Sequence, residues 1–197
     1  MITITFRFKG GAGSGNHGHS GRPGKIGGSA GGSSVQSSEI IHEAVYAVKR
    51  MVNSSERNAE LSLSEEAISF LQQTVDDTEY TLYRGVGLVK GRYDIDKAKR
   101  LKVGDDVPQD LLNVNIASSY SAKPGVAKRY SSGKVSLVME ATVPKTGVLV
   151  DTRNIKRVLQ AYGLSNLFDA DDYKYFQSEA EVIVMHPASA RVYSVKI

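Results

Sequence analysis

The chain has 197 residues, a length that suits a single domain with its own hydrophobic core. It contains no cysteine, which excludes disulfide cross-links, thiolate zinc sites and a cysteine nucleophile. The formal net charge is +4, but all of this excess lies in residues 1–38, which include four basic residues and no acidic one. The remaining residues have equal numbers of acidic and basic side chains, so we expect no nucleic-acid partner.

Residues 1–38 differ in composition from the rest of the chain. Eleven of the 19 glycines lie between Gly10 and Gly32, and such a segment loses much backbone entropy when it orders. We therefore predict a flexible leader over residues 1–38, whose removal leaves the chemistry unchanged, and one folded domain over residues 39–197. The alternating residues at the start could instead form a strand that pairs with another chain.

The leader suggests neither a metal site nor a membrane anchor. His17 and His19 could bind a metal as a pair, but without a third ligand we expect two solvated histidines and no metal. No apolar run approaches the roughly 18 residues that a membrane span needs, so we expect no membrane partner. The start also lacks the basic and apolar regions of a signal peptide.

Helical patterns come first along the domain. Apolar residues recur at helical spacing over residues 37–52, with charged residues between them, and predict an amphipathic helix. A second helix is expected after Ser62, because Ser62 and Glu65 have the spacing of a capping box. On this interpretation, two helices precede any strand.

From residue 80 onward, the pattern changes to short runs rich in β-branched and aromatic residues. These runs predict strands over residues 80–86, 114–118, 135–143, 148–151, 180–185 and 191–197. Shorter helices fit residues 124–130 and 153–162. Helices followed mainly by strands indicate an α+β domain with a β-rich core rather than alternating βαβ units.

Arg84 and Gly85 lie in the first predicted strand. A guanidinium there can bind a phosphate or diphosphate through its fork of donors, and the adjacent glycine allows a ligand to approach the backbone. The alternative is an arginine that forms a surface ion pair at a strand end. No Gly-x-Gly-x-x-Gly motif follows a predicted strand, and the Gly-x-x-x-x-Gly-Lys-Ser/Thr motif does not occur, so the two common nucleotide-binding loops are not predicted.

Two hydroxyl groups follow the second predicted strand. Ser119 and Ser121 could hold a catalytic side chain and a ribose by hydrogen bonds, or one of them could cap the helix that begins near Pro124. A serine nucleophile is disfavoured here because neither serine lies in the Gly-x-Ser-x-Gly pattern of a nucleophile elbow.

Two carboxylates, Glu179 and Glu181, lead into an apolar strand near the end of the chain. At the two-residue period of a strand, both side chains point to one face of the sheet and can address one ligand together. A carboxylate pair suits a reaction through an oxocarbenium-like centre, in which one group stabilises positive charge and the other handles a proton. The alternative is the polar outer face of an edge strand.

Taken in order, Tyr83-Arg84-Gly85, Ser119-Tyr120-Ser121 and Glu179-Ala180-Glu181 resemble the Arg, Ser-x-Ser and Glu-x-Glu signature of the mono-ADP-ribosyltransferases, in the group similar to iota toxin. Ala127, six residues after the second serine, also fits this pattern. Tyrosine stands between the serines, where the family more commonly has threonine. The resemblance covers residues 40–197 and implies a β-rich core of two packed, mostly antiparallel sheets.

The resemblance implies that the substrate is NAD and that the reaction passes ADP-ribose to a protein side chain, with release of nicotinamide. Arg84 would bind the NAD phosphates, and the backbone of Gly85 would hold the nicotinamide carboxamide. Tyr130 would stack on the nicotinamide ring. No metal is needed for this chemistry.

The resemblance also assigns the catalytic groups. Ser119 would position Glu181, Ser121 would support the pocket, and Glu181 would bind the ribose 2′-hydroxyl and stabilise the oxocarbenium ion. Family members with glutamate at the position of Glu179 mostly modify arginine, so we expect arginine on an unidentified host protein as the acceptor. Residues 168–176 correspond to the acceptor-recognition loop of the family, or else form a solvated acidic turn whose aromatic side chains pack into the core.

Two other functions stay open. An NAD glycohydrolase would use the same pocket with water as the acceptor, and a non-catalytic virion or tether module would keep the fold without activity. The leader resembles segments of bacteriophage head-associated proteins and phage-encoded transferases, which implies a phage or prophage origin. We expect a monomeric effector or toxin in the host bacterial cytoplasm, or one that is virion-associated or secreted by a leaderless route.

Overall fold

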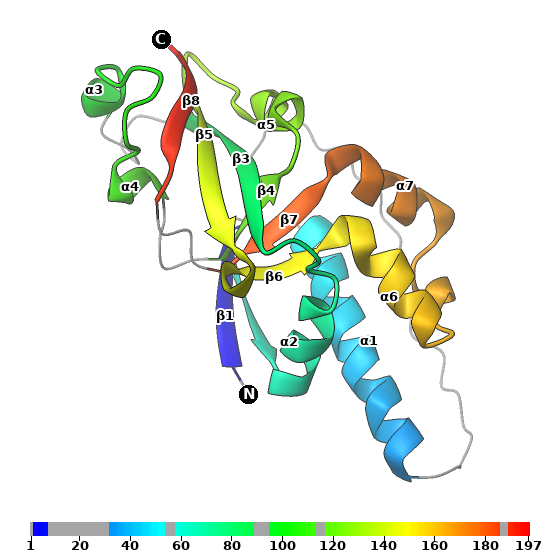
Figure 1. The fold of residues 1–197 in the computed structure, drawn as a ribbon. Helices are drawn as coiled ribbons and strands as arrows, with labels where there is room; N and C mark the ends of the chain where they lie inside the picture. The colour runs from blue at the N-terminus through cyan, green and yellow to red at the C-terminus, as the bar shows by residue number, and fades with distance from the viewer. Residues whose placement is uncertain (1, 8–31, 54–57, 89–94, 113–116, 186–188) are drawn as a thin grey trace.

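The computed structural model describes residues 2–7, 32–53, 58–88, 95–112, 117–185 and 189–197, and it has the predicted α+β architecture (Figure 1). The α-helices of this part of the chain are α1 (Gly32–Asn53), α2 (Glu65–Gln72), α3 (Ile95–Ala98), α4 (Gln109–Leu112), α5 (Pro124–Tyr130), α6 (Ile155–Ala161) and α7 (Ala170–Glu179). The strands are β1 (Ile2–Arg7), β2 (Asn58–Leu63), β3 (Glu79–Leu88), β4 (Ala117–Ser121), β5 (Val135–Pro144), β6 (Val148–Asp151), β7 (Glu181–Val184) and β8 (Arg191–Lys196).

The sheet branches at β4. One edge of β4 pairs antiparallel with β7, and β7 pairs with β6. The other edge pairs in parallel with β1 at Ala117 and Ser118, and antiparallel with β3 at Ser121. From β3 the order continues through β5 to β8, and from β1 to β2, so hydrogen bonds join all eight described strands in one network. Apart from β1 with β4, the strand pairs of this network are antiparallel.

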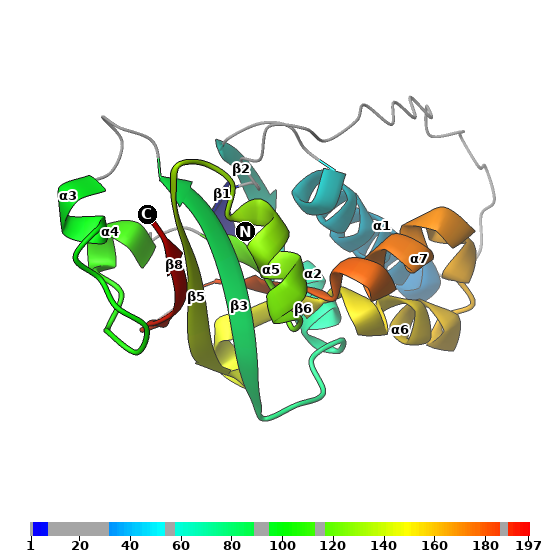
Figure 2. The same cartoon turned by 90° about the horizontal axis from the view of Figure 1, so that it is seen from above.

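Two clusters of buried apolar side chains lie on the two faces of β7. Ile183 packs with side chains from α1, α2, α6 and α7, whereas Val182 and Val184 pack with side chains from β3, β5 and β8. Successive side chains of a strand point to opposite faces, so one short strand contributes to both cores. Figure 2 shows the result, with α1, α6 and α7 on one side of the molecule and α3 and α4 on the other.

Most of the predicted elements are confirmed. The strands expected over residues 80–86, 135–143, 148–151, 180–185 and 191–197 are β3 and β5 to β8, and the helix expected over residues 124–130 is α5. The helices expected over residues 37–52 and 153–162 correspond to α1 and to α6 with the short 3-10 helix Thr152–Asn154 before it. The strand expected over residues 114–118 is β4, which is described from Ala117.

The prediction that two helices precede any strand is wrong, because β1 comes first and β2 separates α1 from α2. The two strands pair antiparallel along their whole lengths, from Ile2 opposite Leu63 to Arg7 opposite Asn58. The first strand therefore pairs within this chain.

The described residues cover only part of the predicted leader. Residues 8–31, which include His17 and His19, lie outside them, and residues 32–38 belong to α1. Within the described ranges, no helix has the length and apolarity to cross a membrane.

The capping box expected at Ser62 is wrong, because Ser62 lies in β2. The N-cap of α2 is Ser64, whose hydroxyl accepts a hydrogen bond from the Ala67 amide at 3.1 Å. The Ser64 hydroxyl and amide both donate to the Glu43 carboxylate at 2.7 Å. A carboxylate from α1 therefore takes the place of the glutamate that a local capping box would supply.

Candidate functional site

The three predicted motifs meet where β4 lies between β3 and β7. In the pairing of β4 with β7, Ser119 lies opposite Ile183 and Ser121 lies opposite Glu181. Nη1 of Arg84 in β3 donates a hydrogen bond to the Ser119 carbonyl at 3.3 Å. The sheet therefore brings together residues that are far apart in the sequence.

Glu181 is the first residue of β7 and is only 1% exposed. The Ser119 hydroxyl donates a hydrogen bond to Oε1 of Glu181. The Thr152 hydroxyl donates to the Glu181 carbonyl at 2.9 Å. The side chain and the backbone of Glu181 are thus each held by a hydroxyl from a neighbouring element, and in such low-dielectric surroundings a carboxylate attracts a cation more strongly than it does in water.

The argument that Glu179 and Glu181 share a strand face is wrong, because Glu179 ends α7 and Glu181 begins β7. Ala180, between them, has the left-handed conformation φ 46°, ψ 48°. This conformation costs an alanine about 1–2 kcal/mol, so the surrounding contacts must hold it. The turn nevertheless keeps the two carboxylates close enough that both raise the pKa of the nearby Tyr130 and Tyr175 hydroxyls.

Ser121 is one of the contacts that hold this turn. Its hydroxyl donates to the Glu179 carbonyl at 2.6 Å and accepts a hydrogen bond from the Lys123 amide at 3.1 Å. The N-cap of α5 is Lys123, without a side-chain capping bond, so neither Ser119 nor Ser121 is the cap. Ser121 instead links the end of β4 to the end of α7.

The Glu179 carboxylate contacts two side chains of α5. Nη2 of Arg129 lies 2.6 Å from Oε1 of Glu179, and the Tyr130 hydroxyl donates to Oε2 at 2.8 Å. Both oxygens of this nearly buried carboxylate therefore have a donor. Tyr130, expected to stack on nicotinamide, uses its hydroxyl to hold the carboxylate expected to bind the acceptor.

Tyr175, which lies in the expected acceptor-recognition loop, extends this group of side chains, although its contacts with the two carboxylates were not predicted. Burial, followed by the hydrogen bond to Glu179 and the charge of that carboxylate, raises the pKa of Tyr130 to about 12. Burial is also the main cause of the raised pKa of Tyr175. The charge of Glu181 and a hydrogen bond to Tyr130 raise this pKa as well. Both phenols therefore stay neutral around the two carboxylates at ordinary pH. Tyr175 and Glu179 are four residues apart and share a helix face, a signal that requires α7 to be recognised first.

Arg84 lies partly buried over an aromatic ring. Its guanidinium carbon is 5.6 Å from the centre of the Tyr120 ring, and Tyr120 is 1% exposed. Burial raises the pKa of Tyr120. The residue between the two serines thus fills the core and supports the guanidinium that the motif assigns to phosphate binding.

Gly85 is required by the packing of α5 on β3. A Cβ atom at Gly85 would lie 1.9 Å from the carbonyl oxygen of Ala127, a contact that no side chain can make. Ala127 is 2% exposed at this contact. Gly85, which was expected to let a ligand approach the backbone, allows the close approach of α5 on this side.

The predicted acceptor-recognition loop at residues 168–176 is mostly the helix α7. Asp169 and Asp172 form a reciprocal capping box at its start, with bonds of 2.8 and 3.2 Å. Phe168 and Phe176 are buried with their rings edge to face, 5.1 Å apart. The aromatic side chains therefore pack into the core, as in the alternative interpretation, while the acidic side chains begin a helix.

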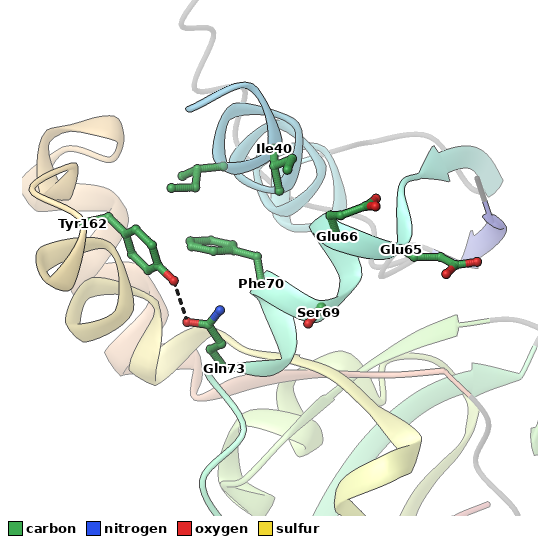
Figure 3. Close-up of a pocket in the computed structure, with 8 residues that line it drawn as sticks. Ile40, Glu65, Glu66, Ser69, Phe70, Gln73 and Tyr162 are labelled. Atoms are coloured by element: carbon green, nitrogen blue, oxygen red, sulfur yellow. Dashed lines mark hydrogen bonds between the residues drawn. The ribbon is translucent and has the colours of Figure 1, made fainter. Parts of the chain in front are cut away.

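A pocket of about 410 Å³ lies elsewhere, between α1, α2 and the end of α6 (Figure 3). Its lining residues are Ile40, Ile41, Glu65, Glu66, Ser69, Phe70, Gln73 and Tyr162. The Tyr162 hydroxyl bonds Gln73 at 3.2 Å, and its ring meets Phe70 edge to face. None of the motif residues lines this pocket.

No three histidine or acidic side chains of the described ranges form a group that could hold a metal. Comparisons of the chain with protein-family models, with curated proteins and with solved structures find no match. The functional interpretation therefore depends on the motifs and on the geometry of the site.

Proposed function

We propose that this protein transfers ADP-ribose from NAD to an arginine side chain of another protein. The convergence of Ser119 with Glu181 and of Ser121 with Glu179 supports this proposal most directly. These residues come from β4, β7 and α7, and each has a contact that suits the role implied by the motif resemblance. A set of unrelated surface residues would have no reason to meet in this way.

The proposed reaction requires two carboxylates with different tasks. The bond between nicotinamide and ribose C1′ breaks, and its electron pair leaves with the nicotinamide. A guanidinium nitrogen of the acceptor forms the new bond to C1′ and loses a proton. Glu181, oriented by Ser119, stabilises the positive charge that develops on the ribose, and Glu179 binds the acceptor and receives its proton.

Arg84 is suited to bind the diphosphate of NAD. Its contacts with the Ser119 carbonyl and the Tyr120 ring restrict the guanidinium before a ligand arrives, which lowers the entropy cost of binding. Arg84 and Glu181 both contact Ser119, so the phosphate-binding cation and the catalytic carboxylate are placed by one residue.

The proposal includes the two-sheet core of the family. Strands β3, β5 and β8 would form one sheet, and strands β6, β7, β4, β1 and β2 the other. This division is supported by the narrow link between the two groups, which is the single registered pair of Tyr83 with Ser121.

Substitution of Glu181 tests the proposed chemistry. With labelled NAD and a protein bearing accessible arginines, Glu181→Gln is expected to lower the turnover number about 10²–10³-fold, the typical loss of one electrostatic contact to a transition state. The amide keeps the shape of the carboxylate and removes its charge. Glu39→Gln, which neutralises an exposed carboxylate in α1, is the matched control and should label as well as the parent.

Full labelling by the Glu181→Gln protein would remove this residue from the reaction. A parent protein that neither labels proteins nor consumes NAD, and is not stabilised against heat by millimolar NAD, would contradict the proposed function. The latter result would favour a non-catalytic tether module.

NAD glycohydrolysis is the second candidate, and one contact favours it. Glu179 already has Arg129 and Tyr130 as donors, so an external guanidinium meets an occupied carboxylate whereas water needs no such site. Product analysis separates the two functions, because a hydrolase releases free ADP-ribose and labels no protein.

A further inference from the structure

Arg129 places a guanidinium where the proposed reaction needs the guanidinium of its acceptor. The ion pair with Glu179 joins a side chain that is 60% exposed to one that is 10% exposed. The carboxylate is thus held inside the protein, while most of the arginine lies at the surface. This asymmetry suggests a fixed binding group and a ligand that can leave.

We propose that Arg129 is an internal ligand of the acceptor site, and that a substrate arginine must displace it before transfer. This inference rests on the proposed function, in which Glu179 binds the acceptor. Arg129 and an acceptor arginine carry the same guanidinium and compete for the same carboxylate oxygen. The apparent association constant for an acceptor is then the intrinsic constant multiplied by the fraction of molecules in which Arg129 has left Glu179.

The local contacts allow this exchange while the Glu179 carboxylate keeps one hydrogen-bond donor throughout. Tyr130 donates to Oε2, the carboxylate oxygen that Arg129 does not use, and stays in place when the arginine moves away. The largely exposed Arg129 side chain can rotate into solvent, and the incoming guanidinium replaces its charge, so the buried Glu179 carboxylate is not left without a cation. Displacement therefore exchanges one guanidinium for another at one oxygen.

Lys128 provides a matched control on the same helix. It carries the same charge as its neighbour Arg129 and is exposed, but its ammonium lies over the Tyr193 ring, 5.6 Å from the centre. Lys128→Gln removes one positive charge from α5 without touching the Glu179 contact. Arg129→Gln removes the same charge together with the internal guanidinium.

The test measures the Michaelis constant for agmatine, a small amine with a guanidinium group, in full-length parent, Arg129→Gln and Lys128→Gln proteins. We expect the constant to fall about 3- to 10-fold in Arg129→Gln, because occupancy by the internal ligand is removed. Lys128→Gln should change it by less than about twofold. A third variant, Arg129→Lys, keeps the charge without the planar fork and should give an intermediate value.

NAD hydrolysis without agmatine is measured for each protein, so that failure of the inference differs from failure of the proposed function. An unchanged or raised agmatine constant in Arg129→Gln that hydrolyses NAD would overturn the internal-ligand role. A raised Michaelis constant for NAD in that variant would assign Arg129 to NAD binding instead. If no protein, including the parent, consumes NAD, the proposed function itself is wrong. Should Arg129→Gln not fold, Arg129→Lys decides, and an agmatine constant equal to that of the parent then overturns the inference.

Discussion

Glu179 and Glu181 are held by different kinds of donor, although only one residue separates them. Glu181 receives a neutral hydroxyl from Ser119, whereas Glu179 receives the guanidinium of Arg129 and the phenol of Tyr130. A neutral donor orients a carboxylate without cancelling its charge, while a cation pairs with that charge. This difference agrees with the proposed division of tasks between stabilising charge on the ribose and binding an acceptor.

The hydrogen bond from Tyr130 to Glu179 should contribute measurably to stability. Tyr130→Phe is expected to lower the free energy of unfolding in urea by about 1.5–3 kcal/mol, the range for bonds to charged groups. The control is Tyr162→Phe, which removes an exposed hydroxyl bonded to the neutral Gln73 and should cost less than about 1 kcal/mol. Equal losses in the two variants would mean that the Glu179 contact adds no more stability than an exposed hydrogen bond to a neutral partner.

The same variant predicts a pH dependence. Folding raises the pKa of Tyr130 from 10.0 to about 12, so the folded state favours the neutral phenol. Its stabilising contribution is fully present below about pH 10 and is lost as the pH rises towards 12. The stability difference between the parent and Tyr130→Phe should therefore shrink over this interval, as measured by urea unfolding at several pH values. A difference that stays constant to pH 12 would contradict the raised pKa.

At the scale of elements, α5 positions the donors of Glu179, and its own position depends on Gly85. Gly85→Ala would push a methyl group into the Ala127 carbonyl, which is backbone and cannot rotate away. We expect a loss of about 1–3 kcal/mol in the free energy of unfolding, as for other overpacked sites. The proposed transferase activity should fall as well, because the displaced helix carries Tyr130, whose hydroxyl holds Glu179.

Gly125→Ala is the control for this substitution, because Gly125 lies in α5, the helix that packs on Gly85, but away from the contact. A Cβ atom at Gly125 would meet no atom within 4 Å, and alanine favours helices more than glycine does. This variant should be as stable as the parent or slightly more stable, by about 0.4–1 kcal/mol. If both alanine variants behave alike in urea unfolding, the close approach of α5 to β3 does not constrain the helix.

The elements that the sequence predicts well have a clear pattern of apolar residues within their own segment. Strands such as β5 and β7 are runs of apolar residues, and α1 has a clear apolar face. Helix α7 was missed because its first turn is acidic and resembles a loop, although Asp169 and Asp172 cap it. Strand β2 was missed because its partner, β1, lies at the other end of a segment that the sequence marks as a linker.

The candidate site was predictable in its members but not in its geometry. Motif order indicated that Ser119 and Glu181 belong together, and the structure joins them by a hydrogen bond. The approach of the Glu179 carboxylate to Glu181 depends on the left-handed conformation of Ala180, which no local sequence pattern predicts. Arg129 and Tyr175 belong to the site because the fold brings α5 and α7 together, a tertiary contact that the local sequence does not predict.

At the scale of the whole molecule, the first strand is part of the sheet that holds the site. β1 pairs with β4 at Ala117 and Ser118, immediately before Ser119, and with β2 along its full length. A chain that lacks residues 1–38 would leave those edges of β4 and β2 without this partner. The boundary drawn from composition therefore does not coincide with the boundary of the hydrogen-bonded sheet.

Removal of residues 1–7 is therefore expected to lower both the free energy of unfolding and the rate of NAD consumption. A synthetic peptide of residues 1–9, added in excess, should restore part of both by pairing with the exposed edges, as peptides do when they add a strand to a sheet. The same peptide with Ile4→Pro should restore less, because proline cannot donate a ladder hydrogen bond. A truncated protein as stable and active as the full chain would show that β1 contributes nothing to the site. Rescue by both peptides alike would show that the contribution does not come from strand pairing.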